Sequence, residues 1–377
     1  MHNILFDIRG NSSWIGGVYY MKNMVFQLLC LRELGYNVQP IVLCTEEFRN
    51  VFSEFENKMK LVVYNEKSKM SRLVALLKVL TKTEYIYNYH EYQFDILKKL
   101  RKKAIYWVPD FQHNHLPQYF TKDELERRTR EYLNYANSKS PIVFSSNDSL
   151  NDFRRFYSKD KKNVYVVPFV SYIEKMLREL SREKEQKILN KFFIANKRYA
   201  CIMNQFWQHK NHLVVFQAIK KYFEQNPDSE FVFVFTGNME DYRSPEYIEK
   251  LKNMVNEPCL ANHIKLLGFI DREEQIAIMK NAEYVIQPSL FEGWGTVVED
   301  AKVLDKTILL SDISVHREQK NNKCILFDPY DSGKLMELIA SEIGKEHVDN
   351  CEVGVQDMYR RAQEYSKGFE RLLEEIE

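Results

Sequence analysis

Several features that define large classes of protein are missing from this sequence. No run of 18 apolar residues occurs among its 377 residues, so no segment is expected to span a bilayer. A net charge of only +1 argues against a dedicated nucleic-acid binder, which would carry a strong basic excess. The six cysteines show no paired spacing such as C-x-x-C and lie among apolar runs, which favours reduced thiols in a cytoplasmic protein.

Some catalytic and targeting motifs are missing as well. No G-x-G-x-x-G follows an early strand, which weakens the interpretation as a nicotinamide enzyme, and no G-x-S-x-G nucleophile elbow occurs. The first residues, Met1–Asp7, resemble a strand and lack the basic, apolar and small-residue regions of a secretory leader. With 45% hydrophobic and 28% charged residues, the composition is that of a soluble globular protein.

The length and the strand pattern predict two α/β domains, each a Rossmann-like doubly wound sheet. A chain of 377 residues exceeds what one core usually supports. Short apolar strands alternate with helical patterns in both halves, as in doubly wound parallel sheets. The candidate strands lie near 2–7, 38–43, 60–64, 104–108, 142–144, 163–167, 199–204, 231–236, 263–267, 283–286, 307–310 and 323–326. The predicted divisions are an N-terminal domain over 1–170, a helical connection over 171–197, a C-terminal domain over 198–354 and a charged helix over 355–377.

The stretch from Pro288 to Ala301 combines features that suit a sugar nucleotide. A strand, a turn containing Gly293, Trp294 and Gly295, and a helix start at Thr296 and Val297 together form an anion site, because unpaired N–H groups and the helix dipole face the loop. Three carboxylates accompany it: Glu292, Glu299 and Asp300. They would repel a phosphate but accept well from the hydroxyls of a sugar or a ribose. The competing interpretation is a buried turn in which Glu292 only caps a helix.

This stretch resembles the carboxylate signature of family 4 retaining glycosyltransferases, which have the GT-B fold of two domains facing across a cleft. In that family two acidic residues separated by seven others contact the donor sugar and the ribose. Glu292 and Asp300 have this spacing, and Glu299, one position early, is the alternative for the ribose. The segment 307–318 resembles the family's next strand and its loop ending in a glutamate.

A second part of the donor site is expected in the segment 201–212, where a strand leads into a polar loop containing Asn204. The family places a basic pair here against the donor diphosphate. Lys210 matches its lysine, whereas Gln205 occupies the arginine position. The resemblance therefore implies that the diphosphate is neutralised by Lys210, by the backbone amides near Thr296 and Val297, and by the side chain of His209. An isolated helix-start lysine is the alternative interpretation of Lys210.

The resemblance assigns the acceptor to the N-terminal domain and implies that the closing helix returns to it. The glycine pair Gly16 and Gly17 opens a predicted amphipathic helix and matches the loop that approaches the donor phosphate, although it could simply be a helix cap. The loop 107–117 lies between two prolines, and the family places a histidine there near the reacting carbon. His113 is the candidate and His115 its competitor.

The implied reaction is transfer of a hexosyl unit from a nucleoside diphosphate sugar to a saccharide or lipid-linked saccharide, with retention of configuration. This reaction would belong to bacterial-type cell-surface polysaccharide or lipopolysaccharide synthesis. Glu292 and His113 are the expected catalytic residues. No Asp-x-Asp occurs, so neither a metal nor another cofactor is expected. The alternatives are a non-hydrolysing sugar-nucleotide epimerase of similar fold and a catalytically silent saccharide-binding protein.

Two basic segments of the N-terminal domain suggest where the acceptor is found. The segment 67–82 holds five cationic and no acidic residues interleaved with leucine and valine, and 98–103 adds five more cations. A basic amphipathic face of this kind docks on anionic lipid. The sequence therefore suggests a peripheral enzyme at the inner membrane face, with solvated helix faces as the alternative.

Overall fold

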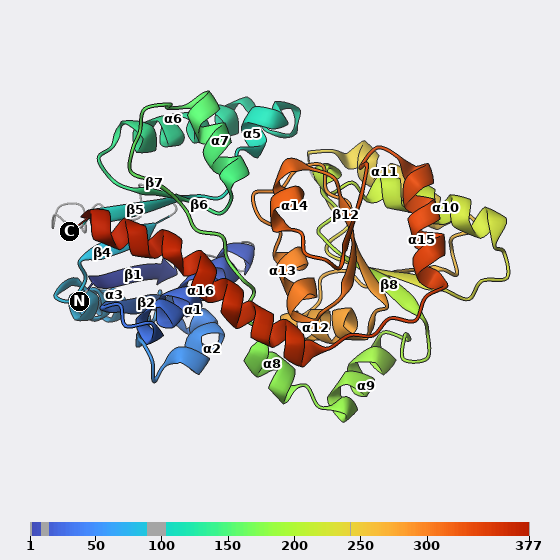
Figure 1. Cartoon of the computed structure of the whole chain (residues 1–377), viewed down its shortest axis with the longest axis horizontal. Helices are drawn as coiled ribbons and strands as arrows, with labels where there is room; N and C mark the ends of the chain where they lie inside the picture. Colours follow the sequence, from blue (N-terminus) through green and yellow to red (C-terminus); the bar gives the residue numbers. More distant parts are fainter. Residues whose placement is uncertain (1, 9–14, 89–102, 242, 377) are drawn as a thin grey trace. The chain divides into compact units, whose positions relative to one another are not determined.

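The computed structural model describes residues 2–8, 15–88, 103–241 and 243–376. The chain divides into two compact units (Figure 1). Unit 1 comprises Met1–Tyr172 and Met358–Glu377, and unit 2 comprises Ile173–Asp357. Each unit is a parallel sheet flanked by helices, which is the expected α/β class. All six cysteine thiols are free. In the ranges that the structure covers, no helix is long and apolar enough to cross a membrane.

Unit 1 contains a seven-stranded parallel sheet in the order β3-β2-β1-β4-β5-β6-β7. The strands are β1 (His2–Ile8), β2 (Val38–Thr45), β3 (Lys60–Tyr64), β4 (Tyr85–Asn88), β5 (Lys103–Val108), β6 (Ile142–Phe144) and β7 (Val164–Val166). The helices are α1 (Ile15–Glu33), α2 (Arg49–Phe52), α3 (Lys69–Leu80), α5 (Gln112–His115), α6 (Lys122–Asn137) and α7 (Asn147–Phe156), with 3-10 turns at Glu46–Phe48, Ser53–Phe55 and Pro117–Tyr119. The sequence patterns miss β4, because its four residues are too few to show a period.

Helix α1 is not amphipathic as the sequence predicted, since it is buried on every side. Each of two buried polar side chains makes one hydrogen bond inside unit 1: Gln27 donates to the Pro168 carbonyl at 2.9 Å, and Asn23 accepts from the Tyr172 N–H at 3.0 Å. Gly16 and Gly17 lie in the first helical turn, and the residues before Ile15 are outside the described ranges. The structure therefore shows this pair as part of a helix and not as a turn.

Unit 2 contains a six-stranded parallel sheet in the order β10-β9-β8-β11-β12-β13. The strands are β8 (Tyr199–Met203), β9 (Val232–Thr236), β10 (Ile264–Leu266), β11 (Tyr284–Gln287), β12 (Thr307–Ser311) and β13 (Cys324–Phe327). The helices are α8 (Glu174–Glu179), α9 (Arg182–Lys191), α10 (His212–Gln225), α11 (Pro245–Val255), α12 (Arg272–Asn281), α13 (Thr296–Val303), α14 (Ser314–Gln319) and α15 (Ser332–Ile343), with the 3-10 turn η6 at Gln208–Lys210. The strand order is the 3-2-1-4-5-6 arrangement of dinucleotide-binding folds.

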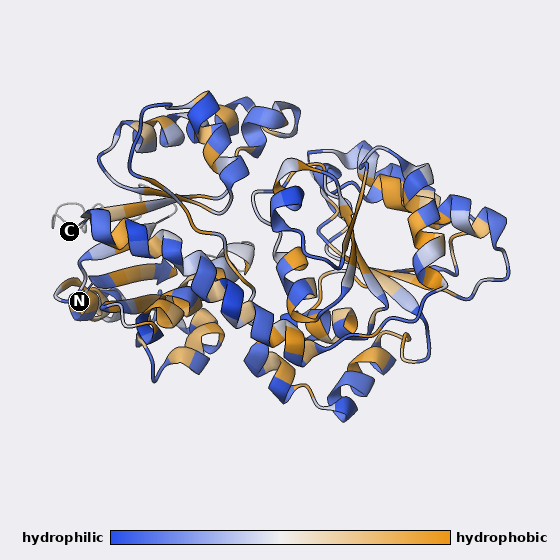
Figure 2. Cartoon of the chain, viewed as in Figure 1, coloured by the Kyte–Doolittle hydropathy of each residue, from blue (hydrophilic) through white to orange (hydrophobic). Residues whose placement is uncertain are grey.

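The segment 171–197, expected to be a helical connection between two domains, belongs mostly to unit 2 and contains the two helices α8 and α9. Helix α9 packs on α12. Ion pairs hold them together, with Lys184 bonded to Glu273 at 2.5 Å and Lys280 bonded to Glu185. Figure 2 shows hydrophobic residues in the strands of both units and polar residues along the visible face of the last helix.

That last helix, α16 (Cys351–Ile376), crosses from unit 2 into unit 1. A glycine lies against each unit where the helix backbone approaches closely. A Cβ on Gly354 would lie 2.2 Å from the Val303 carbonyl oxygen in unit 2, and a Cβ on Gly368 would lie 2.3 Å from the Val166 carbonyl oxygen in unit 1. Only hydrogen fits at these positions without a backbone shift.

We expect Gly354→Ala and Gly368→Ala each to lower the free energy of unfolding by about 1–3 kcal/mol, the usual cost of overpacking. Urea unfolding of the full chain measures this difference. Gly344→Ala is the matched control, because its new Cβ would have no atom closer than 3.8 Å. Equal stability of all three variants would show that α16 is not packed this tightly.

Candidate functional site

The polar residues at the centre of the unit 2 sheet follow two adjacent strands, β8 and β11. The strand order reverses at this pair, and ligands of such sheets bind at the carboxyl ends of the strands on either side of the reversal. Asn204 comes directly after β8, and Gln287 is the last residue of β11. The Asn204 side-chain amide donates to Gln287 Oε1 at 2.8 Å. This hydrogen bond therefore joins the two loops where they begin.

Glu292 lies beyond this point, and its oxygen Oε1 accepts three hydrogen bonds. Lys210 Nζ donates at 2.6 Å, Gln287 Nε2 at 2.9 Å and Ser289 Oγ at 2.8 Å. The side chains of Lys210 and Glu292 are 15% and 11% exposed, so the ion pair is largely protected from water. Lys210 is the last residue of η6, and the Leu290 N–H donates to the His209 carbonyl at 2.8 Å, which joins the two loops. The structure thus brings together the two charged residues that the sequence singled out.

The charges and hydrogen bonds around Glu292 favour its ionised form. Burial alone would raise its pKa, but the charge and hydrogen bond of Lys210, with the hydrogen bond from Ser289, lower the pKa below its usual 4.5. Lys210 and Glu292 therefore form a compact charge pair at neutral pH. A ligand anion can compete for the lysine, and a ligand hydroxyl can donate to the carboxylate.

A buried histidine, His316 on α14, completes the surroundings of this pair. Its Nδ1 lies 2.9 Å from the Ser311 carbonyl oxygen, so that N–H donates there and Nε2 is left as an acceptor. In the part of the chain that the structure describes, Nε2 has no hydrogen-bond partner. Burial lowers the His316 pKa to about 4, so the ring is neutral at pH 7. The sequence did not identify this residue as part of the site.

The glycine loop is held by a side chain that the sequence also missed. Gln319 Oε1 accepts from the Gly295 N–H at 3.1 Å, and its Nε2 donates to the Gly295 carbonyl at 2.8 Å. Gly295 caps α13, whose first residues are Thr296 and Val297, and Trp294 is buried beside Gly293. This arrangement fixes the helix N-terminus that the sequence predicted as an anion site.

Glu299 and Asp300 are both fully buried and both have cationic partners within unit 2. Arg272, the first residue of α12, holds Asp300 with two hydrogen bonds, one of 2.6 Å between Nη1 and Oδ2. Glu299 Oε1 accepts from Lys302 Nζ and from Gln319 Nε2, each at 3.0 Å. After His316 and Gln319, Arg272 is the third residue of this region that the sequence analysis did not identify. Neither carboxylate is exposed to solvent.

Gln205 and His209 do not supply positive charge. Gln205 Oε1 accepts from the Asn238 N–H at 2.8 Å and so fixes the loop after β9. His209 is buried, and burial, followed by the charges of Lys210 and Arg243, holds its pKa well below 6.5. The expectation that His209 helps to neutralise a diphosphate is therefore wrong at neutral pH, because its ring is uncharged.

In unit 1 the structure places His113 within the core instead of on an exposed loop. The ring is 2% exposed, packs against Tyr132, and has Nε2 2.8 Å from the Tyr157 hydroxyl. Burial and the nearby Arg128 lower its pKa to about 4. Over the described ranges its Nδ1 has no hydrogen-bond partner. His115 bonds instead to Asp152, with Nε2 2.7 Å from Oδ2.

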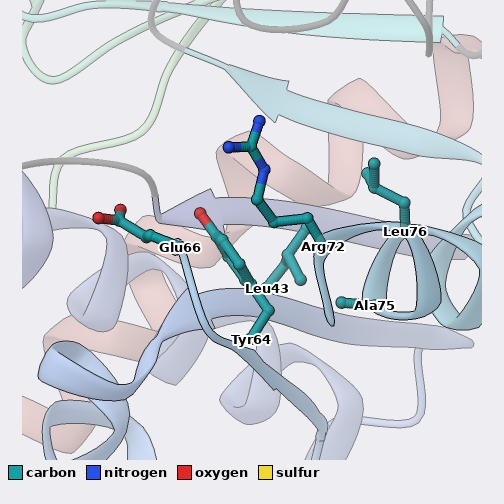
Figure 3. A pocket seen from close by; sticks show the side chains of 6 residues that line it. All are labelled: Leu43, Tyr64, Glu66, Arg72, Ala75 and Leu76. Carbon is teal, nitrogen blue, oxygen red and sulfur yellow. The ribbon is translucent and has the colours of Figure 1, made fainter. Parts of the chain in front are cut away.

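A pocket of about 400 Å³ lies in unit 1 beside α3 and the carboxyl ends of β2 and β3. Figure 3 shows the polar ends of Tyr64, Glu66 and Arg72 gathered on one side, with Ala75 and Leu76 on the other and Leu43 below. Glu66 and Arg72 make no ion pair with the residues described. The pocket therefore offers one positive group, one negative group and a hydroxyl.

We expect Glu292→Gln, which keeps an acceptor oxygen but removes the charge, to lower the free energy of unfolding at pH 7 by roughly 2 kcal/mol. The pKa of Glu292 is depressed in the folded state, so its contribution is present above about pH 4.5 and is lost as pH falls through the lowered pKa. Urea unfolding at pH 7, 5, 4 and 3 measures the free energy of unfolding of the variant and of wild type. The difference between the two values should become smaller only below pH 4.5. Glu337→Gln, at the exposed pair with Lys334, is the control and should change little.

Comparisons with known proteins agree with this fold. Residues 182–367 match the family model described as glycosyl transferases group 1. The chain is 26% identical over 279 residues to an Escherichia coli UDP-Gal:alpha-D-GlcNAc-diphosphoundecaprenol alpha-1,3-galactosyltransferase, covering 71% of this chain and 67% of that protein.

Solved structures show the same architecture. Anabaena HepE in complex with UDP and glucose superposes with a TM-score of 0.64 at 16% identity, covering 100% of this chain and 98% of HepE. WaaG, a glycosyltransferase involved in lipopolysaccharide biosynthesis, superposes with a TM-score of 0.57 at 12% identity, covering 99% and 98%. The two doubly wound sheets, together with the match of residues 182–367 to the group 1 model, thus identify this chain as a glycosyltransferase of the GT-B fold.

Proposed function

We propose that this chain transfers a hexosyl unit from a uridine diphosphate sugar to a lipid-linked saccharide, with retention of anomeric configuration and without a metal ion. The observation that carries the proposal is the protected contact between Lys210 and Glu292 at the reversal of the unit 2 sheet. Support for the donor comes from the relative named for UDP-Gal and from HepE, which holds UDP and glucose. The same relative and WaaG favour cell-surface polysaccharide or lipopolysaccharide synthesis.

In this proposal the donor diphosphate binds between Lys210 and the N-terminus of α13. The ammonium of Lys210 and the N–H groups of Thr296 and Val297 supply positive charge where the leaving phosphate gains negative charge. Because Lys210 is already held at 2.6 Å by Glu292, little reorganisation is needed when the phosphate arrives. The electrostatic role often given to a metal is thus taken by a lysine and a helix end.

The donor sugar would be oriented by Glu292 and His316. With Oε1 occupied by three donors, the second carboxylate oxygen is directed to sugar hydroxyls, and the neutral His316 accepts a further hydroxyl at Nε2. His113 is the proposed sugar contact of unit 1 through Nδ1, its ring atom without a partner in the described part of that unit. Because the ring is buried, this contact requires the residues that cover it to move when the donor binds.

By spacing Asp300 is the proposed ribose ligand, with Glu299 as the alternative. Because both are fully buried and paired with Arg272 and Lys302, this contact requires one of these pairs to open when the donor binds.

The chemical step requires no nucleophile from the enzyme. The bond from the anomeric carbon to the phosphate oxygen breaks, and the acceptor oxygen bonds to the same face of that carbon. The proton of the acceptor hydroxyl moves to the departing phosphate oxygen, so the products are the glycoside and UDP. Lys210 stabilises the phosphate, and exclusion of water protects the donor from hydrolysis.

We expect release of a nucleoside diphosphate from one of a panel of uridine, guanosine and adenosine diphosphate sugars, with kcat/KM unchanged by chelator. Lys210→Ala should lower kcat/KM by about 100–1,000-fold, the range seen when an anion-stabilising donor is removed. Lys221→Ala is the control, because Lys221 is exposed on α10 and bonds only to Ser332.

Other outcomes would identify the alternatives. Conversion of the sugar without release of the nucleoside diphosphate would indicate the epimerase. Donor binding without any turnover, even with a crude glycolipid acceptor, would indicate a silent saccharide-binding protein.

The pocket of unit 1 is the proposed acceptor site, where Arg72 meets a phosphate and Glu66 and Tyr64 meet hydroxyls. We expect Glu66→Gln and Tyr64→Phe each to raise the KM for a short-chain glycosyl diphosphate lipid about tenfold, the cost of one hydrogen bond to a charged or polar group. The KM for the donor is the internal reference. Equal acceptor KM values for wild type and both variants would place the acceptor elsewhere.

A further inference from the structure

Helix α3 of unit 1 carries an apolar face that is open to solvent. Met70, Leu73, Val74 and Leu77 are 69%, 52%, 42% and 57% exposed. Their spacing of i, i+3, i+4 and i+7 puts them on one side of the helix. We call these four residues the α3 stripe. A contiguous row of large exposed apolar side chains marks an interaction surface more often than isolated ones do.

The fold of unit 1 does not need the α3 stripe. The other side of the helix packs on the sheet through Ala75 and Val79, which are buried, with Leu76 and Leu80 beside them. These residues contact the core cluster that contains Leu43 and Tyr64 of β2 and β3. The helix is therefore apolar on two opposite sides, and only one of them is used for packing within unit 1.

Uncompensated positive charge surrounds the α3 stripe. Five cations and no acid occur between residues 67 and 82: Lys67, Lys69, Arg72, Lys78 and Lys82. Across the described ranges, none of the five forms an ion pair. By contrast, the exposed cations Lys334 and Arg360 each pair with an acid three or four residues away.

The positive charges of these lysines also affect the pKa of a neighbouring lysine. The pKa of Lys60 on β3 is lowered, first by burial and then by the charges of Lys82 and Lys78. Glu66, the nearest acid before the segment, lines the pocket. The surface around the α3 stripe is thus complementary to an anionic partner, and the stripe itself is complementary to an apolar one.

We propose that α3 docks unit 1 on a bilayer that contains anionic phospholipid. Met70, Leu73, Val74 and Leu77 enter the boundary between headgroups and acyl chains, while the flanking lysines contact lipid phosphates. Lys69 and Lys78 lie on either side of the stripe by helical spacing, which suits long side chains that bury their methylenes and keep their charge in the headgroup layer. The second basic segment, 98–103, lies outside the described residues except for Lys103 and does not contribute to this argument.

Docking of α3 on a bilayer would also determine where the unit 1 pocket lies relative to the lipid headgroups. Arg72, Ala75 and Leu76 line the pocket from the same helix. A helix lying on a bilayer would hold the pocket beside the headgroup layer, where a lipid-linked saccharide presents its polar part. This link depends on the proposed acceptor, whereas the docking of α3 on lipid does not.

Vesicle co-sedimentation of the full chain tests the docking. We expect binding to vesicles of phosphatidylcholine with phosphatidylglycerol and none to phosphatidylcholine alone. Leu73→Gln/Leu77→Gln should weaken binding at least tenfold, because two leucines no longer enter the bilayer. Lys78→Gln/Lys82→Gln should weaken it roughly thirtyfold and reduce its salt dependence, since each basic residue near the surface contributes about a fivefold factor.

The control Lys159→Gln/Lys162→Gln removes the same charge from exposed positions of unit 1 outside α3 and should bind as wild type does. Donor turnover by the leucine variant, equal to that of wild type, shows that the chain remains folded and keeps this result separate from the test of catalysis. Equal vesicle binding by wild type and the leucine variant would overturn the proposal. Concentration-dependent dimers in sedimentation velocity, lost in that variant without any vesicle binding, would instead make the α3 stripe a contact between two copies.

Discussion

One carboxylate oxygen organises the donor half of this protein. Oε1 of Glu292 accepts from Lys210, Gln287 and Ser289, and Gln287 is in turn held by Asn204. These residues come from the loops after β8 and β11, which are adjacent where the strand order reverses. The sheet therefore determines which loops meet, and the carboxylate determines how they lie. A buried charge is stable here only because each of its donors is itself positioned by another contact.

The distribution of charge around this oxygen is selective. In unit 2 the buried histidines His209 and His316 have pKa values lowered by burial, so they are neutral at pH 7 and act as hydrogen-bonding groups. Positive charge comes from Lys210, while Arg272 and Lys302 neutralise the buried acids of α13. Glu292, Glu299 and Asp300 thus each have a cationic partner within unit 2. A nucleotide sugar would meet a site whose electrostatics are already arranged.

The sequence was sufficient for the α/β class, for the six strands of unit 2 and for the positions of a lysine after β8 and a glutamate after β11, although not for the ion pair between them. Those features depend on local runs and on a resemblance that spans a whole segment. The strand β4 was missed because four residues carry no period. Helix α1 was mistaken for amphipathic because its polar residues Lys22, Asn23 and Gln27 are buried inside unit 1. Arg272 and Gln319 could not be predicted, since each reaches a partner more than twenty residues away through the packing of α12 or α14. His209 is uncharged because it is buried. Its burial could not be predicted, since a sequence does not show whether a single polar residue is buried.

Helix α16 makes unit 1 discontinuous in the chain, and this has a consequence for synthesis. Its buried residues Phe369, Leu372 and Leu373 lie at the end of the sequence, while the rest of unit 1 ends at Tyr172. During translation the first sheet leaves the ribosome long before these side chains exist, and the surface that they cover stays open while all of unit 2 is made. Unit 2 can therefore complete its fold first, and the segment Met358–Glu377, which is made after unit 2, then closes the unit whose sheet was made before it.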